Sequence, residues 1–253
     1  MNNVQQQINE ILKSTKPENL FVAFDVDMTL TQPKQAEMYY PTLKKYSAIY
    51  KKILGSMPVE KQDIMLSLIV QYPQQLVEAY TPKVINELQR RGVKTIAFTN
   101  STTGKIKTND GSIESIAHIR YEYLNQLGIN FSKSFAIEDV VFNKLPMHRG
   151  NYPEFYKGIL LANGEKGKDA GKGKVLIAFL ELVDMNPEVI IMIDDKLKNL
   201  QDIETALQKY NPKIIFIGME YEAAKNYIVP DVSEYDFTKF WENLAVQAAD
   251  QPI

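Results

Sequence analysis

Three uninterrupted apolar runs, each followed at once by polar residues, most limit the folds that this chain can adopt. The runs are LFVAFD at 20–25, VKTIAFT at 93–99 and EVIIMI at 188–193. Because apolar residues do not alternate with polar ones in these runs, we predict strands of a parallel sheet that are buried on both faces. Segments with helical patterns separate the runs. This order favours an α/β fold with helices on both faces of the sheet.

Helix signals are clearest between the first two runs. Thr81 as N-cap, Pro82 at the first helical position and Gly92 just past the end bound one predicted helix. Further helices are predicted at 4–14, 113–127, 175–183 and after Pro230, a fourth strand at 213–217, and strand-like runs at 134–142 and 155–162.

Residues 33–80 are expected to form a helical insertion, in pieces broken near Gly55, Pro58 and Pro73. The predicted organisation is therefore a core domain of 1–32 and 81–253 with a helical insertion at 33–80. A chain of 253 residues with 45% hydrophobic content is long enough for one such core.

The amino-acid composition argues against several classes of function. The net charge of -2, from 29 basic and 31 acidic side chains, provides no general attraction to nucleic acid, so no nucleic-acid partner is expected. The absence of cysteine excludes disulfides, thiolate nucleophiles and cysteine-ligated zinc. The two histidines, His118 and His148, are not at metal-ligand spacing. Chemistry is therefore expected from carboxylates, hydroxyls and lysines.

No apolar stretch approaches the roughly 20 residues that span a bilayer. The first residues, MNNVQQQINEILKS, also lack the apolar centre of a signal peptide. We therefore expect no membrane span and, by default, a cytoplasmic protein. Export, with a signal that lies outside this chain, is the alternative.

Reactive side chains follow three of the predicted strands. Asp25 and Asp27 follow the first, Thr99 ends the second, and Asp194 and Asp195 follow the third. Since the carboxyl ends of parallel strands meet at one edge of the sheet, these side chains should converge. Neighbouring carboxylates repel one another unless they share a cation, and oxygen ligands suit Mg²⁺. The pattern thus predicts a Mg²⁺ site rather than a set of helix caps.

The same residues resemble a known family. Asp-x-Asp-x-Thr at 25–29, then Thr99, then Lys172, then Asp194-Asp195 is similar to the four motifs of the haloacid dehalogenase-like (HAD) superfamily. Finer details, including GKGKVL and IDDKLKNL, resemble a bacterial subgroup called DUF2608. The resemblance implies a Rossmann-like core with a helical C1-type cap and a Mg²⁺-dependent phosphohydrolase. An acid at position 27 favours phosphoryl chemistry over carbon–halogen cleavage.

The resemblance also implies a role for each residue at the phosphoryl group. Asp25 would be the nucleophile that forms an aspartyl-phosphate, and Asp27 the general acid and base. Thr99, with Ser101 as the alternative, would bind a phosphoryl oxygen. Lys172, with Lys174 as the alternative, would neutralise the charge.

Other residues are expected to bind the substrate or the metal. Asn100 and Thr29 are the expected substrate-binding residues. Asp195 would bind Mg²⁺ directly and Asp194 through water, and the remaining protein ligands would be the Asp25 carboxylate and the Asp27 carbonyl. Two interpretations stay open for Asn199, which would either brace the Asp-Asp turn or lie on a helix surface.

The predicted cap is rich in basic and aromatic residues, namely Lys34, Lys44, Lys45, Lys51, Lys52, Tyr39, Tyr40, Tyr46 and Tyr50. These residues would either form a lid over an anionic substrate or pack and solvate the cap in the ordinary way. Lys166 and Lys168 are expected to be solvated loop lysines.

The expected substrate is a phosphorylated small molecule or a phosphotyrosine-type group. A phosphotransferase or mutase of the same superfamily, or a binding module with incidental activity, is the alternative function.

Overall fold

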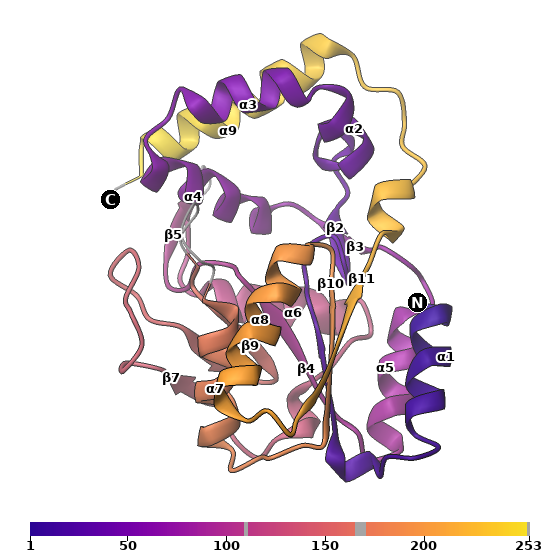
Figure 1. Cartoon of the computed structure of the whole chain (residues 1–253). Coiled ribbons are helices and arrows are strands. Elements are labelled where there is room, and N and C mark those ends of the chain that lie inside the picture. Colours follow the sequence, from indigo (N-terminus) through magenta and orange to yellow (C-terminus); the bar gives the residue numbers. More distant parts are fainter. Residues whose placement is uncertain (109–110, 165–170, 252–253) are drawn as a thin grey trace.

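A seven-stranded, mostly parallel sheet forms the centre of the protein. The computed structural model describes residues 1–108, 111–164 and 171–251 (Figure 1). The strand order is β11 (Ile215–Glu220), β10 (Val189–Asp194), β1 (Leu20–Phe24), β4 (Lys94–Thr99), β9 (Ile159–Leu161), β8 (Glu154–Tyr156) and β7 (Asp139–Val141). Neighbours from β11 to β9 are parallel, and β8 runs antiparallel to both β9 and β7. The predicted α/β class is confirmed.

Strand β1 explains why its apolar run is continuous. Leu20, Val22 and Phe24 belong to the hydrophobic core on one face of the sheet, whereas Phe21 and Ala23 belong to the core on the other. A strand with a core on each face has no solvent-exposed side, so both sets of alternating positions must be apolar.

Helices cover both faces, as predicted. Helices α1 (Asn2–Ile11), α5 (Thr81–Arg90) and α6 (Ile116–Gln126) contribute to the first core. Helices α7 (Lys172–Leu182) and α8 (Leu197–Tyr210) pack together on the second, opposite α1 and α5 in Figure 1. The predicted helices and core strands match closely, but the last strand, predicted at 213–217, is displaced toward the C-terminus. The run at 134–142 forms a strand only at β7, and the run at 155–162 is divided between the antiparallel strands β8 and β9.

The inserted segment is helical and broken, as expected. It contains α2 (Tyr40–Lys45), α3 (Ser47–Gly55) and α4 (Val59–Ser67) between the strands of a two-stranded antiparallel ribbon, β2 (Thr31–Pro33) and β3 (Gln74–Leu76). The remaining elements are the ribbon β5 (Ile106–Thr108) and β6 (Gly111–Ile113), the C-terminal helix α9 (Glu234–Ala249), and 3-10 turns at Pro17–Asn19, Ala36–Met38, Leu68–Gln71, Ser132–Ser134 and Ala223–Asn226.

Helix α9 lies with the inserted helices, alongside α3 and α4 (Figure 1). The ring centroids of Tyr46 and Phe237 are 4.9 Å apart, and those of Tyr50 and Trp241 are 4.7 Å apart. Two tyrosines of the predicted lid therefore pack against the C-terminal helix. The division at residues 33 and 80 stays a prediction, and α9, which that division assigns to the core, belongs by its packing to the helical layer.

Two buried polar contacts join α4 to loops at the edge of the main sheet. The hydroxyls of Ser67 and Thr102 form a hydrogen bond, and His148 Nε2 lies 3.3 Å from Asp63 Oδ2. Lys166 and Lys168 lie outside the described residues. Within the described ranges, none of the helices combines the length and apolar character that crossing a membrane requires.

Candidate active site

The loop after β1 holds the first two acids in a tight turn. The backbone N–H of Asp25 donates to the carbonyl of Ile193 at 2.8 Å, which extends the pairing of β1 with β10. Met28 has a φ of 66°, a left-handed conformation that is rare for residues other than glycine. Its N–H donates to the Thr31 carbonyl at 2.8 Å. This turn places Asp25 and Asp27 at the carboxyl edge of the sheet.

Lys172 connects two strands through their acids. Its fully buried Nζ donates to Asp25 Oδ1 at 2.8 Å, to Asp194 Oδ2 at 2.6 Å and to the carbonyl of Phe98 at 2.9 Å. A side-chain carbon at Gly173 would lie 2.5 Å from Ala206 of α8, so only glycine permits the close packing of α7 on α8 next to this lysine. Lys172 is therefore the lysine that contacts the acids.

Asp194 has several hydrogen-bond donors. Besides Lys172, the Asn199 amide nitrogen donates to both of its oxygens, at 2.9 and 3.0 Å, and the N–H of Lys196 donates at 2.9 Å. Asn199 thus braces the Asp-Asp turn, which was one of its two predicted interpretations. These contacts fix Asp194 as the residue that orients Lys172, while the neighbouring carboxylate of Asp195 remains partly exposed.

The acids around Lys172 carry excess negative charge. Burial raises the pKa of Asp25 well above its usual range and the charge of Asp194 adds to the shift, against the opposing effect of Lys172. Burial likewise raises the pKa of Asp195 to about 6, although the charge of Lys196 opposes it. A further cation would therefore be favourable here.

The donor set fits a hard divalent cation. Carboxylate oxygens of Asp25, Asp194 and Asp195 lie within 4.8 Å of one another. Mg²⁺ prefers oxygen ligands and is usually bound by one or two carboxylates together with water and phosphate oxygens. The residues present therefore fit the predicted cofactor.

Arg120 of α6 is a site residue that sequence reasoning missed. It is 4% exposed, and its guanidinium donates to Asp27 Oδ1 at 3.1 Å, to Asp27 Oδ2 at 2.9 Å and to the Tyr123 hydroxyl at 2.6 Å. Burial pushes the pKa of Asp27 upward, but the charge and hydrogen bonds of Arg120 outweigh it and lower the pKa. Asp27 is therefore held ionised at neutral pH.

Of the other predicted phosphoryl-binding residues, Thr99 contacts Asp27. Thr99 Oγ1 lies 3.4 Å from Asp27 Oδ2 and accepts the N–H of Ser101 at 3.1 Å. Thr99 therefore lies at the acids. Thr29 Oγ1 and Asn100 Oδ1 are buried, and they form no hydrogen bond within the described part of the chain.

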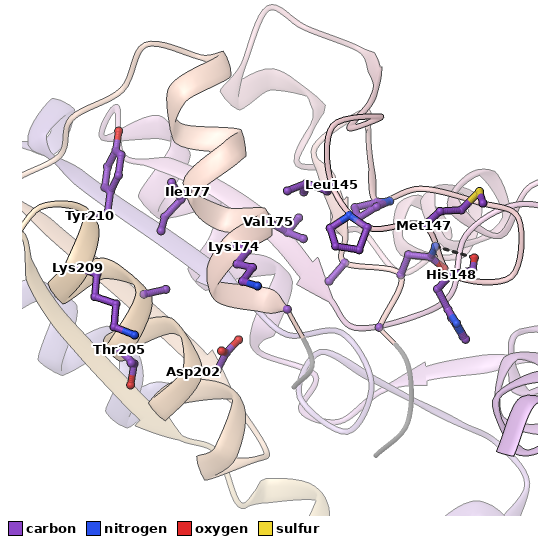
Figure 2. A pocket seen from close by; sticks show the side chains of 17 residues that line it. Leu145, Met147, His148, Lys174, Val175, Ile177, Asp202, Thr205, Lys209 and Tyr210 are labelled. Carbon is purple, nitrogen blue, oxygen red and sulfur yellow. Dashed lines mark hydrogen bonds between the residues drawn. The ribbon is translucent and has the colours of Figure 1, made fainter. Parts of the chain in front are cut away.

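Lys174, the alternative to Lys172, lies elsewhere. It lines a cavity of about 650 Å³ between α7, α8 and the loop around Met147 (Figure 2). None of the four acids lines this cavity. This cavity is therefore separate from the acid cluster.

The histidines contact other residues, away from the acid cluster. His118 Nδ1, on α6, is 3.1 Å from the Tyr156 hydroxyl. His148 contacts Asp63 of α4.

Comparison with known proteins places the chain in a family. The family described as "Protein of unknown function (DUF2608)" matches residues 1–250. The chain belongs to the DUF2608 family. An uncharacterized protein of Rickettsia bellii is 26% identical over 87% of this chain and 75% of its own length. One of Rickettsia prowazekii is 31% identical over 70% of this chain. The chain spans 57% of that second relative's length.

Among solved structures, a phosphoserine phosphohydrolase-like protein from Francisella tularensis is similar to this DUF2608 protein. Sequence identity is 16%, the match covers 81% of this chain and 91% of the other, and the TM-score is 0.35. At that TM-score the likeness carries no argument about function.

Proposed function

We propose that this DUF2608 protein is a Mg²⁺-dependent phosphohydrolase of the HAD type that cleaves a phosphate monoester through an aspartyl-phosphate on Asp25. The observation that carries the proposal is the buried bridge from Lys172 to Asp25 and Asp194, with Asp195 beside it, at the carboxyl ends of β1 and β10. A lysine held between two acids orients a carboxylate and leaves room for a cation, which is what attack on a charged phosphoryl group needs.

In the first step, a carboxylate oxygen of Asp25 attacks phosphorus, and the bond from phosphorus to the leaving oxygen breaks. Lys172 keeps the nucleophile in place and offsets the charge of the phosphoryl group. In the second step, water attacks the same phosphorus, the bond to Asp25 breaks, and free phosphate is released.

Asp27 would be the residue that transfers protons in this mechanism. Arg120 keeps Asp27 ionised, which suits the second step because a carboxylate can then take a proton from the attacking water. The first step would be easiest for a leaving group that needs little protonation. An aryl phosphate, which resembles phosphotyrosine, is therefore the best first substrate, and phosphorylated small molecules are the next.

Mg²⁺ would be held by Asp25, Asp195 and the Asp27 carbonyl, with Asp194 through water. When bound, it would supply positive charge for the phosphoryl oxygens.

The test is hydrolysis of p-nitrophenyl phosphate by the wild type and by Asp25→Asn, with Mg²⁺ or with EDTA. We expect Asp25→Asn and EDTA each to remove at least about 10³ of the rate, because the covalent nucleophile or its charge stabilisation is lost. Asp184→Asn, which alters an exposed acid at the opposite end of α7, should keep the wild-type rate. Full activity of Asp25→Asn would contradict the proposal.

A further inference from the structure

We propose that Lys196 is a substrate-binding residue that contacts the phosphoryl dianion. The inference deepens the proposed phosphohydrolase function and rests on it. None of the roles assigned above belongs to Lys196.

The backbone fixes where Lys196 lies. It follows Asp195 directly, and its N–H donates to Asp194 Oδ1 at 2.9 Å. Its φ of -121° and ψ of 112° are those of an extended residue, and it lies directly before α8, which begins at Leu197. Lys196 therefore starts from the same strand end as the two acids.

The ammonium group of Lys196 has no fixed partner, unlike the other cations of the site. Lys172 is held by two acids and a carbonyl, and both hydrogen-bonding nitrogens of Arg120 are used by Asp27. Across the part of the chain that the structure describes, no side-chain hydrogen bond or ion pair engages Lys196, and its side chain is exposed.

Lys196 nevertheless lies beside the acids. It follows Asp195 directly and its N–H is bonded to Asp194, so the carboxylates attract its ammonium without holding it in one geometry.

The balance of positive and negative charges in the site indicates a role for Lys196. Lys172 and Arg120 offset two of the four carboxylates, and one divalent cation would offset the other two. A phosphate monoester then brings two further negative charges into the crevice. Among the described residues, Lys196 is the remaining cation that interacts with these acids. An ammonium on a flexible stem can swing to a phosphoryl oxygen at little cost in geometry.

A competing explanation is that Lys196 only substitutes for the metal ion beside Asp195. The two explanations differ in what removal of the charge does. A phosphoryl-binding lysine is needed for substrate affinity, whereas a substitute for the metal competes with Mg²⁺, so its removal should tighten Mg²⁺ binding and leave substrate affinity unchanged.

The experiment compares the wild type, Lys196→Met, Lys196→Arg and Lys209→Met. Lys209 is an exposed lysine at the far end of the same helix, so it controls for loss of one charge. The readouts are kcat and KM for p-nitrophenyl phosphate at saturating Mg²⁺, the Kd of orthovanadate by calorimetry with Mg²⁺ present, and the Kd of Mg²⁺ alone.

We expect Lys196→Met to raise KM and the orthovanadate Kd by about tenfold or more, as loss of one charge-assisted contact should, with a smaller change in kcat. Lys196→Arg should restore most of the affinity, and Lys209→Met should match the wild type. An unchanged orthovanadate Kd in Lys196→Met, or a tighter Mg²⁺ Kd with KM unaltered, would overturn the assignment.

Failure of the proposed function would be recognised separately. If the wild type hydrolyses no phosphate ester, the phosphohydrolase proposal is wrong, and the orthovanadate titration still decides the role of Lys196. A wild type that also fails to bind orthovanadate would overturn both.

Discussion

Asp25 and Asp27 lie two positions apart on one loop, yet their surroundings are opposite. Asp25 is 5% exposed and shares one lysine with a second acid. The side chain of Asp27 is 47% exposed and has a buried arginine to itself, with one hydrogen bond to each oxygen. Burial and neighbouring acids raise the pKa of Asp25, whereas Arg120 lowers that of Asp27.

These different surroundings suit Asp25 and Asp27 to different tasks. Around Asp25 the acids outnumber their one lysine, so this part of the site favours binding of a cation, which in turn favours the phosphoryl group. The Asp27 half is already neutralised, so it is suited to orienting one carboxylate for proton transfer. Pairs of titratable groups whose pKa values are driven apart commonly mark such a division of roles.

Removing Lys172 should have the largest effect on stability. Lys172→Met leaves two buried carboxylates without their shared cation, and loss of one partner from a buried pair costs ~3–5 kcal/mol. Urea unfolding of the variant should show this loss in the free energy of unfolding, and Asp194→Asn in the same chain should recover part of it. Lys174→Met is the control and should stay within ~0.5 kcal/mol of the wild type. If Lys172→Met and Lys174→Met are equally stable, Lys172 does not stabilise the two buried acids and this prediction is wrong.

Removing Arg120 should cost less. Because Asp27 is half-exposed, water can replace part of the lost contact, and we expect Arg120→Met to lower the free energy of unfolding by ~1–2 kcal/mol. The value of kcat for an aryl phosphate should fall about 10- to 100-fold, since a misoriented Asp27 transfers protons poorly.

Arg120→Lys tests whether charge or geometry matters in this half. Lysine retains the charge but not the two parallel hydrogen bonds, so it should restore little of kcat. Complete restoration would mean that charge alone suffices, and the orienting role assigned to Arg120 would be wrong.

The smallest expected effect is a pH dependence of Mg²⁺ affinity. Asp195, with a pKa raised to about 6, must lose its proton to bind a cation, so protons compete with Mg²⁺ below that pH and not above it. Calorimetric titration should give a Kd about tenfold weaker at pH 5 than at pH 7.5. An unchanged Kd over this range would mean that Asp195 is not a ligand. Asp27 should have no part in this dependence.

The sheet and the positions of the acids were predictable from local patterns. Continuous apolar runs identified β1, β4 and β10, and the residues that end them converge because parallel strands share one edge. The short β2–β3 and β5–β6 ribbons were missed because three residues are too few to show a period of two. The C-terminal helix was predicted, but its place against α3 and α4 follows from aromatic contacts such as that of Tyr50 with Trp241, which are long-range.

Arg120 could not be identified from the sequence for the same reason. It lies 93 residues from Asp27 in the sequence. Nothing in the sequence of α6 distinguishes it from the other polar residues of that helix. Only the folded chain shows that it is buried. Lys196, by contrast, is adjacent to Asp195 in the printed sequence, and its significance depends on which of the site's cations already have partners.

The proposed mechanism requires that Asp25 becomes covalently phosphorylated. The most direct test is mass spectrometry of the wild type, quenched in acid within the first turnovers with an aryl phosphate and Mg²⁺, followed by peptide mapping. We predict one phosphoryl adduct on the peptide that contains Asp25, absent from Asp25→Asn and from wild type treated with EDTA. Turnover of the substrate with no adduct under any quench time, or an adduct that persists in Asp25→Asn, would contradict the account.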